Sequence, residues 1–163
     1  MLVGVVSDTH NRIGHVEEII ELFNYHEVGL VIHTGDITNA QTLETFSKLN
    51  CPLKGVYGNN DHNEIGLNEA SLRNGFDFRL PPFVLSIEEK RIAIFHEPDP
   101  IESFLKERKD IDLILHGHTH RYRNEYIKGI KFFNPGECAG SFKGKNAIGL
   151  VKTETLEIQR IFF

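Results

Sequence analysis

The sequence predicts an α/β fold in a single domain of 163 residues. Short apolar runs alternate with segments of helical periodicity, which is the pattern of successive strand, helix, strand units. Residues with metal-binding side chains follow directly after several of these runs. No linker, internal repeat or charge run divides the chain, and its length is within the usual range of about 100 to 200 residues for one domain.

The N-terminal third of the chain contains three strands that should be parallel. Residues 2–6 are continuously apolar and mostly β-branched, which is typical of a strand buried on both faces. Residues 13–23 place apolar side chains at helical spacing. A strand at 30–32, a helix at 41–49 and a strand at 53–57 repeat the pattern. Right-handed crossovers would bring the ends of the three strands to one edge of a sheet.

The rest of the chain predicts further alternation and then a β-rich close. The expected elements are a helix at 68–74, a hairpin of strands at 83–87 and 91–95, a helix at 101–109, a strand at 111–115, and strands at 122–127, 130–133, 147–152 and 156–162. We expect the last four strands to complete a second sheet.

Composition and charge exclude several classes of function. The chain has 18 basic and 23 acidic residues and a formal net charge of −5, which argues against a nucleic-acid protein with a broad basic surface. The charge is still compatible with a short or terminal nucleotide as the substrate. No apolar run approaches the roughly 18 residues of a membrane span, and the N-terminus lacks a secretory pattern. Cys51 and Cys138 match no metal-ligand spacing, so we expect free thiols and a cytoplasmic protein without a membrane partner.

Five of the predicted strands end in residues that bind metal ions. The residues are Asp8 and His10, then Asp36, Asn59 and His96, and finally His118 and His120. Taken alone, Asp8 is more simply explained as the N-cap of the following helix. The repetition at strand after strand favours a metal site instead. Carboxylate and imidazole donors without thiolate suit Mn, Fe, Ni or Zn.

The order of these motifs resembles that of the calcineurin-like metallophosphoesterases over nearly the whole chain. The motifs are Asp8-x-His10, Gly35-Asp36, Gly58-Asn59, His96 and Gly117-His118-x-His120. The short length and two further segments are similar to the small bacterial and archaeal phosphodiesterase branch, which also contains a retromer subunit. These segments are Gly58-Asn59-Asn60-Asp61 and Asn134-Pro135-Gly136-Glu137-Cys138. The resemblance implies a four-layer α/β/β/α sandwich of two mixed sheets.

The resemblance also implies a site for two divalent metal ions, with Mn as the first expectation and Ni, Fe or Zn as alternatives. The implied ligands are Asp8, His10, Asp36 and His120 for one ion, and Asp36, Asn59, His96 and His118 for the other. Two cations about 3.5 to 4 Å apart need a shared anionic ligand, which is Asp36 here. The implied reaction is attack on phosphorus by a metal-bridging water or hydroxide, with Asp36, Asn59 and Asn60 as catalytic residues.

Two departures from the wider family bear on the substrate. Larger relatives carry a His acid directly after the metal-binding Asn, whereas Asn60 in this chain cannot act as an acid but can hydrogen-bond a phosphate oxygen. His62 lies two residues further on, and we interpret it as an exposed loop histidine. Relatives usually have Gly after the ligand His96, where this chain has Glu97 and Pro98. Because Glu97 would repel a dianion more than a monoanion, we expect phosphodiesters to be preferred over phosphomonoesters.

The other histidines and the polar residues beside the motifs have plainer interpretations. We expect packing or hydrogen-bonding roles, without metal ligation, for His15, His26, His33 and His116. Candidates for contact with a substrate phosphate are Asn11, Arg12 and Arg121.

Two functions of different classes fit these observations. The first is a metal-dependent phosphodiesterase acting on a small or nucleotide-like phosphodiester. The second is a protein-interaction scaffold similar to the retromer subunit, with weak or no catalysis, which Asn60 and Glu97 keep open. The intact ligand set favours the enzyme, because a scaffold has no physical need for it. A structural zinc module is disfavoured because such sites are usually rich in Cys. Phe162 and Phe163 indicate buried or interface aromatic surface, and the second of these alternatives would make a homodimer possible.

Overall fold

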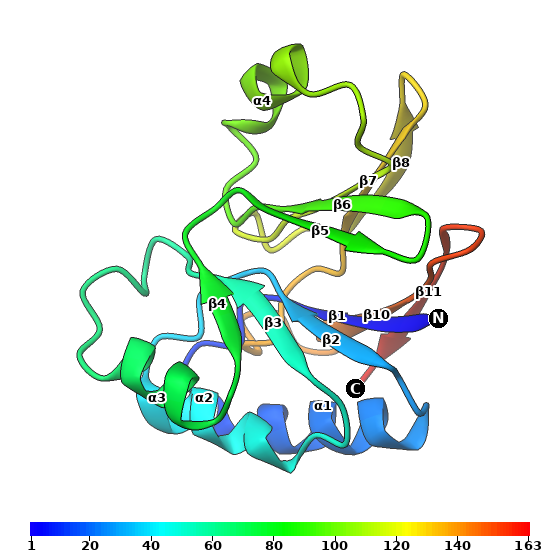
Figure 1. Cartoon of the computed structure of the whole chain (residues 1–163). Coiled ribbons are helices and arrows are strands. Elements are labelled where there is room, and N and C mark those ends of the chain that lie inside the picture. Colours follow the sequence, from blue (N-terminus) through cyan, green and yellow to red (C-terminus); the bar gives the residue numbers. More distant parts are fainter.

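The computed structural model describes residues 1–163 and arranges them in two β-sheets and four α-helices. Figure 1 shows four layers: α1, α2 and α3 cover one face of the first sheet, the second sheet packs on its other face, and α4 lies outside the second sheet. The helices are α1 (Ile13–Tyr25), α2 (Ala40–Thr45), α3 (Leu67–Arg73) and α4 (Ile101–Glu107), with a short 3₁₀ helix at Phe46–Lys48. The implied four-layer α/β/β/α sandwich is therefore confirmed.

The first sheet has six strands in the order β11-β10-β1-β2-β3-β4. Their bounds are β1 (Leu2–Val6), β2 (Leu30–His33), β3 (Leu53–Val56), β4 (Asp77–Arg79), β10 (Ala147–Lys152) and β11 (Glu157–Phe162). The strands β1 to β4 are parallel neighbours, whereas β10 pairs antiparallel with β1, and β11 pairs antiparallel with β10. This confirms that the three N-terminal strands are parallel and that their carboxyl ends share one edge.

The second sheet has five strands in the order β5-β6-β7-β9-β8, and it is also mixed. Their bounds are β5 (Phe83–Ile87), β6 (Lys90–Ile94), β7 (Leu113–Leu115), β8 (Arg123–Ile127) and β9 (Ile130–Asn134). The predicted hairpin is the antiparallel pair β5 and β6, while β7 lies parallel to both β6 and β9. The polar residues that follow β6 and β7 therefore leave this sheet at one edge.

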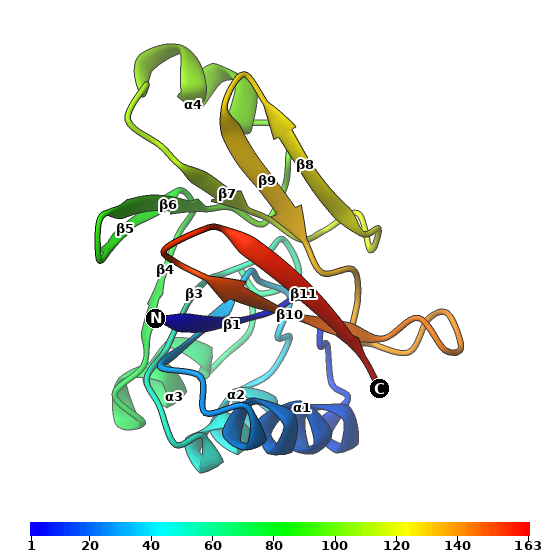
Figure 2. The ribbon, with the colours of Figure 1, turned by 90° about the vertical axis from the view of Figure 1, so that its right-hand side faces the viewer.

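The prediction that all four C-terminal strands complete the second sheet is wrong for the last two. Figure 2 shows β10 and β11 beside β1 in the first sheet, where Leu150 lies opposite Gly4. The apolar pattern of β10 indicates a buried strand, but it does not reveal which neighbour the strand pairs with. The sequence also does not predict β4, because this three-residue strand has only one buried side chain, Phe78.

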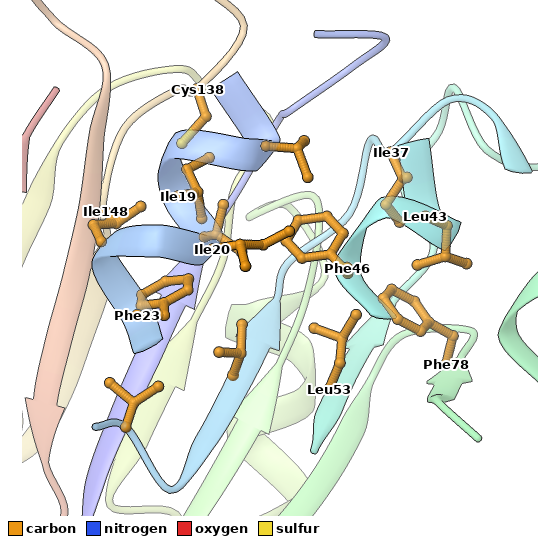
Figure 3. Close-up of a cluster of buried hydrophobic side chains, with 14 of the residues drawn as sticks. Ile19, Ile20, Phe23, Ile37, Leu43, Phe46, Leu53, Phe78, Cys138 and Ile148 are labelled. Atoms are coloured by element: carbon orange, nitrogen blue, oxygen red, sulfur yellow. The ribbon is translucent and has the colours of Figure 1, made fainter. Parts of the chain in front are cut away.

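Three hydrophobic cores fill the spaces between the layers. In the first, which Figure 3 shows, Ile19 and Phe23 of α1 pack towards the first sheet together with Phe46. The second core joins the two sheets and includes Val3 and Val5 of β1. The third lies between the second sheet and α4. Because Val6 belongs to the first core while Val3 and Val5 belong to the second, β1 is apolar on both faces.

The helices agree with the sequence pattern except where the second one ends. Residues predicted as one helix at 41–49 form α2 as far as Thr45 and then a 3₁₀ turn that ends at Lys48. Asn39 begins α2, since its side chain accepts a hydrogen bond of 2.7 Å from the Thr42 backbone N–H. None of the helices is long and apolar enough to cross a membrane.

Candidate metal centre

The candidate site lies where the loops after five strands meet. Three of these loops follow β1, β2 and β3 of the first sheet, and two follow β6 and β7 of the second. Backbone hydrogen bonds join neighbouring loops: the Asp8 N–H donates to the Gly35 carbonyl at 3.0 Å, and the Gly117 N–H donates to the His96 carbonyl at 3.0 Å. The structure thus brings the predicted site residues of both sheets together.

Asp8, His10 and His120 form the first group of ligand atoms, which all lie within 4.8 Å of one another. The His120 Nε2 atom is 3.4 Å from Asp8 Oδ1. Asp8 is fully buried, yet its Oδ1 atom accepts no hydrogen bond. A buried carboxylate oxygen without a partner is costly, and a cation held between it and the imidazoles would satisfy it. Asp8 does not cap the first helix, whose N-cap is Arg12.

A second group contains Asp8, Asp36 and His96, whose ligand atoms also lie within 4.8 Å of one another. The side-chain oxygen of Asn59 extends this group. It lies 2.9 Å from His96 Nε2 and 3.0 Å from His118 Nδ1. Every residue predicted to bind metal is therefore part of one continuous cluster at the junction of the two sheets.

The buried carboxylate of Asp36 belongs to the second group and also faces His10 of the first. Its Oδ1 atom is 3.3 Å from His96 Nε2, and its Oδ2 atom is 3.9 Å from His10 Nε2. Each oxygen therefore faces a histidine of a different group, which is the geometry that a shared ligand requires.

Five of the seven predicted ligands have a left-handed backbone conformation. Their φ angles are 51° for Asp8, 45° for His10, 61° for Asp36, 65° for His118 and 56° for His120. Non-glycine residues rarely adopt positive φ, and such conformations cluster at functional sites, where they cost of order 1 kcal/mol each or more. The loops therefore turn sharply at the ligands themselves, and the sheets and cores hold that strain.

Two glycines allow the loops to approach the carboxylates closely. A Cβ atom on Gly58 would lie 2.2 Å from Asp36 Oδ1, and one on Gly117 would lie 2.0 Å from Ser7 Oγ and 2.8 Å from Asp8 Oδ2. Both positions thus exclude any side chain. This explains why a glycine precedes a predicted ligand in the Gly58-Asn59 and Gly117-His118 motifs.

Comparison with known families agrees with this geometry. Residues 1–156 match the family model described as the calcineurin-like phosphoesterase superfamily domain. The chain belongs to this superfamily. The family predicted from the order of the sequence motifs is therefore confirmed.

Individual phosphoesterases are similar over nearly their full length. A phosphodiesterase of Methanocaldococcus jannaschii is 32% identical over 165 residues, which cover 99% of this chain and 98% of that protein. The solved structure of an archaeal phosphodiesterase has a TM-score of 0.90 and 30% identity, and the match covers 100% of both chains. A phosphoesterase from E. coli (TM-score 0.72, 19% identity, 99% of this chain and 98% of that one) shares the fold. So does Vps29 of Entamoeba histolytica complexed with Zn²⁺ (TM-score 0.69, 18% identity, 99% of both chains).

Two histidines of this phosphoesterase domain are held through the ring nitrogen that faces away from the cluster. The His96 Nδ1–H donates to the Thr34 carbonyl at 2.9 Å, and His120 Nδ1 lies 3.2 Å from Oε2 of the buried Glu137. Metal-binding histidines usually have such a partner, because it fixes the tautomer and leaves Nε2 free to ligate. The sequence marks the Glu137 loop as a motif, but only the structure pairs Glu137 with His120.

Replacing Glu137 with Gln is expected to weaken metal binding by about 10- to 100-fold, because the amide is neutral and no longer supports the basicity of His120. Metal titration followed by calorimetry measures this change. The matched control is Glu154→Gln, which alters an exposed carboxylate and should leave the affinity unchanged. Equal affinity of Glu137→Gln and the unsubstituted protein would contradict the assigned role of Glu137.

Asp61 braces the loops that carry Asp36 and Asn59. Its buried carboxylate accepts four backbone N–H bonds, from Asp36 at 2.9 Å, Ile37 at 3.0 Å, Thr38 at 2.7 Å and Gly58 at 2.7 Å. Burial is the main cause that raises the pKa of Asp61, and these donors oppose it. Sequence reasoning missed this role, although an Asp three residues after Gly58 is a local signal for a side-chain-to-backbone turn.

Asn60 holds the carboxylate of Asp36 from both of its oxygens. The Asn60 side-chain amide donates to Oδ2 at 2.7 Å, and the backbone N–H donates to Oδ1 at 3.0 Å. Burial alone would raise the pKa of Asp36, but hydrogen bonds from His96 and Asn60, with the charge on His96, lower it well below its usual value. The sequence predicts that Asn60 faces a phosphate oxygen, whereas in the structure its amide donates to Asp36.

His96 and His120 respond to the same carboxylates. Burial lowers the pKa of His96, but the hydrogen bond and charge of Asp36 outweigh it, so the net shift is upward. The carboxylate of Asp8, whose Oδ1 atom lies 3.4 Å from His120 Nε2, is the main cause that raises the pKa of His120. Without metal, a proton on each ring thus offsets part of the negative charge that the carboxylates bring together.

His33 and His116 are buried beside the cluster and remain neutral. The His33 Nδ1 atom accepts a hydrogen bond of 3.1 Å from the Gly35 N–H, so its Nε2–H donates to Thr9 Oγ1 at 3.0 Å. Burial lowers the pKa of His33 to about 3 and that of His116 to about 4. Both histidines are buried and hydrogen-bonded, as the sequence predicts.

The lowered pKa of His33 predicts a contribution to the stability of the metal-free protein that is lost below pH 6.5. In the unfolded chain His33 binds a proton near pH 6.5, but in the folded chain only near pH 3, so its contribution to stability is complete above pH 6.5 and decreases as the pH falls. Between pH 7 and pH 5 this loss is about 2 kcal/mol. The raised pKa values of His96 and His120 act in the opposite direction, so the test compares two proteins.

The comparison is between the unsubstituted protein and His33→Gln in urea unfolding at pH 5, 6 and 7. The variant should be less stable at pH 7 but lose about 2 kcal/mol less on going to pH 5. Parallel curves of unfolding free energy against pH would show that His33 is not the titrating group.

Other residues singled out in the sequence lie around the cluster. His62 and Glu97 are exposed, and both line a pocket that Asn59 and His96 border. Arg12 is exposed next to the first loop. Asn11 and Arg121 are also exposed. His15 Nδ1 lies 2.7 Å from the Cys138 carbonyl. The His26 ring packs against the Tyr25 ring. Neither His15 nor His26 belongs to either ligand group.

Proposed function

We propose that this chain is a metal-dependent phosphodiesterase that hydrolyses a small or nucleotide-like phosphodiester. The observation that carries the proposal is the position of Asp36, whose two oxygens face histidines of two different ligand groups. The unpartnered, buried Oδ1 of Asp8 adds a second requirement for a cation. The similarity of 32% to a phosphodiesterase over nearly both chains supports the same reaction class.

The proposed cofactor is a pair of divalent ions. One would be held by Asp8, His10, Asp36 and His120, and the other by Asp36, Asn59, His96 and His118. The donor set of carboxylate, amide and imidazole suits Mn, Ni, Fe or Zn, and Mn is the ion we expect. When bound, such ions act as Lewis acids towards phosphate oxygens and lower the pKa of water, which supplies the nucleophile at neutral pH.

The residues of the chain position this chemistry. Asn60 keeps Asp36 ionised and fixes its orientation, and Thr34 and Glu137 orient the rings of His96 and His120. Because the Asn60 amide is bonded to Asp36 and is no acid, it does not protonate a leaving group. Substrates with leaving groups that need little protonation are therefore favoured.

Metal-free protein tested with and without Mn decides between the enzyme and the scaffold. We expect Mn to stimulate hydrolysis of bis(p-nitrophenyl) phosphate, and p-nitrophenyl phosphate to be hydrolysed more slowly, because the exposed Glu97 repels a dianion more than a monoanion. Metal binding without hydrolysis of any ester would favour a protein-interaction scaffold. A monoester hydrolysed faster than the diester would contradict the preference for diesters.

The cellular setting is part of the proposal. Cys51 and Cys138 are free, and burial raises the pKa of the Cys138 thiol to about 12, which supports a cytoplasmic enzyme with inert thiols. We propose one domain over residues 1–163, because the second core joins both sheets. Phe162 is 56% exposed, which supports a homodimer that light scattering can test.

A further inference from the structure

A small pocket with a volume of about 60 Å³ opens directly beside the second ligand group. Asn59 and His96 form its inner wall, so whatever occupies it touches a substrate held at the metal centre. The remaining wall belongs to residues that neither the ligand set nor its supporting hydrogen bonds use. The pocket is thus in the right place to hold one of the two ester groups of a phosphodiester.

The outer walls of the pocket are rigid and largely apolar. Tyr57 lines one side, and three prolines (Pro81, Pro82 and Pro100) line others. The Tyr57 ring is fixed, because it packs 5.6 Å from the Phe78 ring and its hydroxyl lies 3.5 Å from Asn68 Oδ1. Rings of proline and tyrosine lose little conformational freedom when a ligand binds, and their flat faces suit another flat group.

The charge around the pocket excludes a second anion. No lysine or arginine lines it, and Glu97 is the one acidic residue among its lining side chains. A neighbouring pocket that shares Tyr57 and His62 is lined by one exposed carboxylate, Glu64, and again by no lysine or arginine; the Asp61 carboxylate beside it is buried and already accepts four backbone hydrogen bonds. A ligand extending from the metal centre in this direction therefore meets negative charge and no cation that could pair with a phosphate.

We propose that this pocket receives an uncharged aromatic ester group, such as a nucleoside with a single phosphate linkage, and rejects an ester group that carries a second phosphate. The proposal rests on the proposed phosphodiesterase function and narrows its substrate class. Tyr57 provides the stacking surface, and Glu97 provides both the repulsion of anions and an acceptor for an amino or hydroxyl donor on the bound group.

The test uses a series of p-nitrophenyl diesters that differ only in the second ester group. The second groups are methyl, thymidine 5′-yl, and thymidine 5′-yl with an added 3′-phosphate. With Mn present, we expect kcat/KM for the thymidine ester to exceed that for the methyl ester by about tenfold, since stacking of a base on an aromatic side chain has this magnitude. The kcat/KM for the 3′-phosphorylated ester should be lower than that for the unphosphorylated thymidine ester.

Two variants assign these preferences to the pocket. Tyr57→Ala should reduce the thymidine-to-methyl ratio of kcat/KM to near one, while Tyr126→Ala, which removes an exposed tyrosine of β8, should leave that ratio unchanged. Glu97→Gln should reduce several-fold the ratio of kcat/KM for the unphosphorylated thymidine ester to kcat/KM for the 3′-phosphorylated one. The ratios cancel any general loss of turnover that a change beside Gly58 and Asn59 causes.

Saturation-transfer NMR with metal-free protein gives a readout that does not depend on turnover. The base protons of the thymidine ester should receive more saturation than its sugar protons, and Tyr57→Ala should remove this difference. Equal kcat/KM for the methyl and thymidine esters, a preference for the 3′-phosphorylated ester, or an unchanged ratio in Tyr57→Ala would each overturn the proposal. Failure to hydrolyse any diester would instead overturn the proposed function itself.

Discussion

Replacing Asp36 with Asn is expected to lower metal-stimulated hydrolysis by at least about 100-fold and to reduce the metal content from two ions towards one or none. The expected loss exceeds that for a residue that only supports a ligand, because each oxygen of Asp36 faces a different ligand group. An amide is also neutral, so it would offset none of the positive charge of the two proposed cations. In addition, its NH₂ group would oppose the Asn60 amide, which now donates to Oδ2.

Metal analysis by mass spectrometry and the rate with a chromogenic diester measure this effect together. The control is Asp110→Asn, which removes a carboxylate whose partners are the exposed side chains of Arg91 and Arg108. That variant should retain both ions and its full rate. An Asp36→Asn protein that holds two ions and turns over normally would show that Asp36 is not the shared ligand.

Replacing Asp61 with Ala should reduce the free energy of unfolding by about 4 kcal/mol or more, which is the largest stability effect we expect. Hydrogen bonds to a charged group contribute about 1.5 to 3 kcal/mol each, and the variant removes the acceptor of four backbone N–H groups. Gly58 and Asp36 would lose their fixed positions at the same time. Metal binding should therefore weaken together with stability.

Urea unfolding of metal-free protein measures the change. Asp61→Asn is the companion variant, because its one carbonyl oxygen can still accept some of these bonds, and it should lie between Asp61→Ala and the unsubstituted protein. Asp110→Asn again serves as the control and should leave the free energy of unfolding nearly unchanged, since its ion pairs are exposed. A loss below 1 kcal/mol in Asp61→Ala would show that water replaces the carboxylate.

The sequence is sufficient to predict most elements and the cluster of candidate ligands, for a physical reason that applies to both. A buried parallel strand is a continuous apolar run, and the sharp change to Asp8, Asp36 or His118 marks its end. Parallel neighbours then bring these ends together. The pairing of β10 with β1 could not be predicted in this way, because the apolar run 147–151 fits a strand of either sheet.

The contacts that support the site could not be predicted because they join distant parts of the chain. Asp61 accepts bonds from residues 23 to 25 positions earlier, and Glu137 meets His120 across a hairpin. The Asn60 side chain illustrates the same limit: its chemistry allowed a phosphate or a carboxylate as partner, and only the approach of the two loops selects Asp36. A pattern of residue types specifies donors and acceptors but not which of them meet.

The origin of the ligands in both sheets has a mechanical consequence. Asp8, His10, Asp36 and Asn59 belong to loops of the first sheet, whereas His96, His118 and His120 belong to loops of the second. A cation held by both sets is a cross-link between the two halves of the sandwich, so separating the sheets requires releasing it. Ligand binding at 100 times the dissociation constant adds about 2.7 kcal/mol to stability. We therefore expect the melting temperature of this protein to rise with the concentration of the metal ion around it.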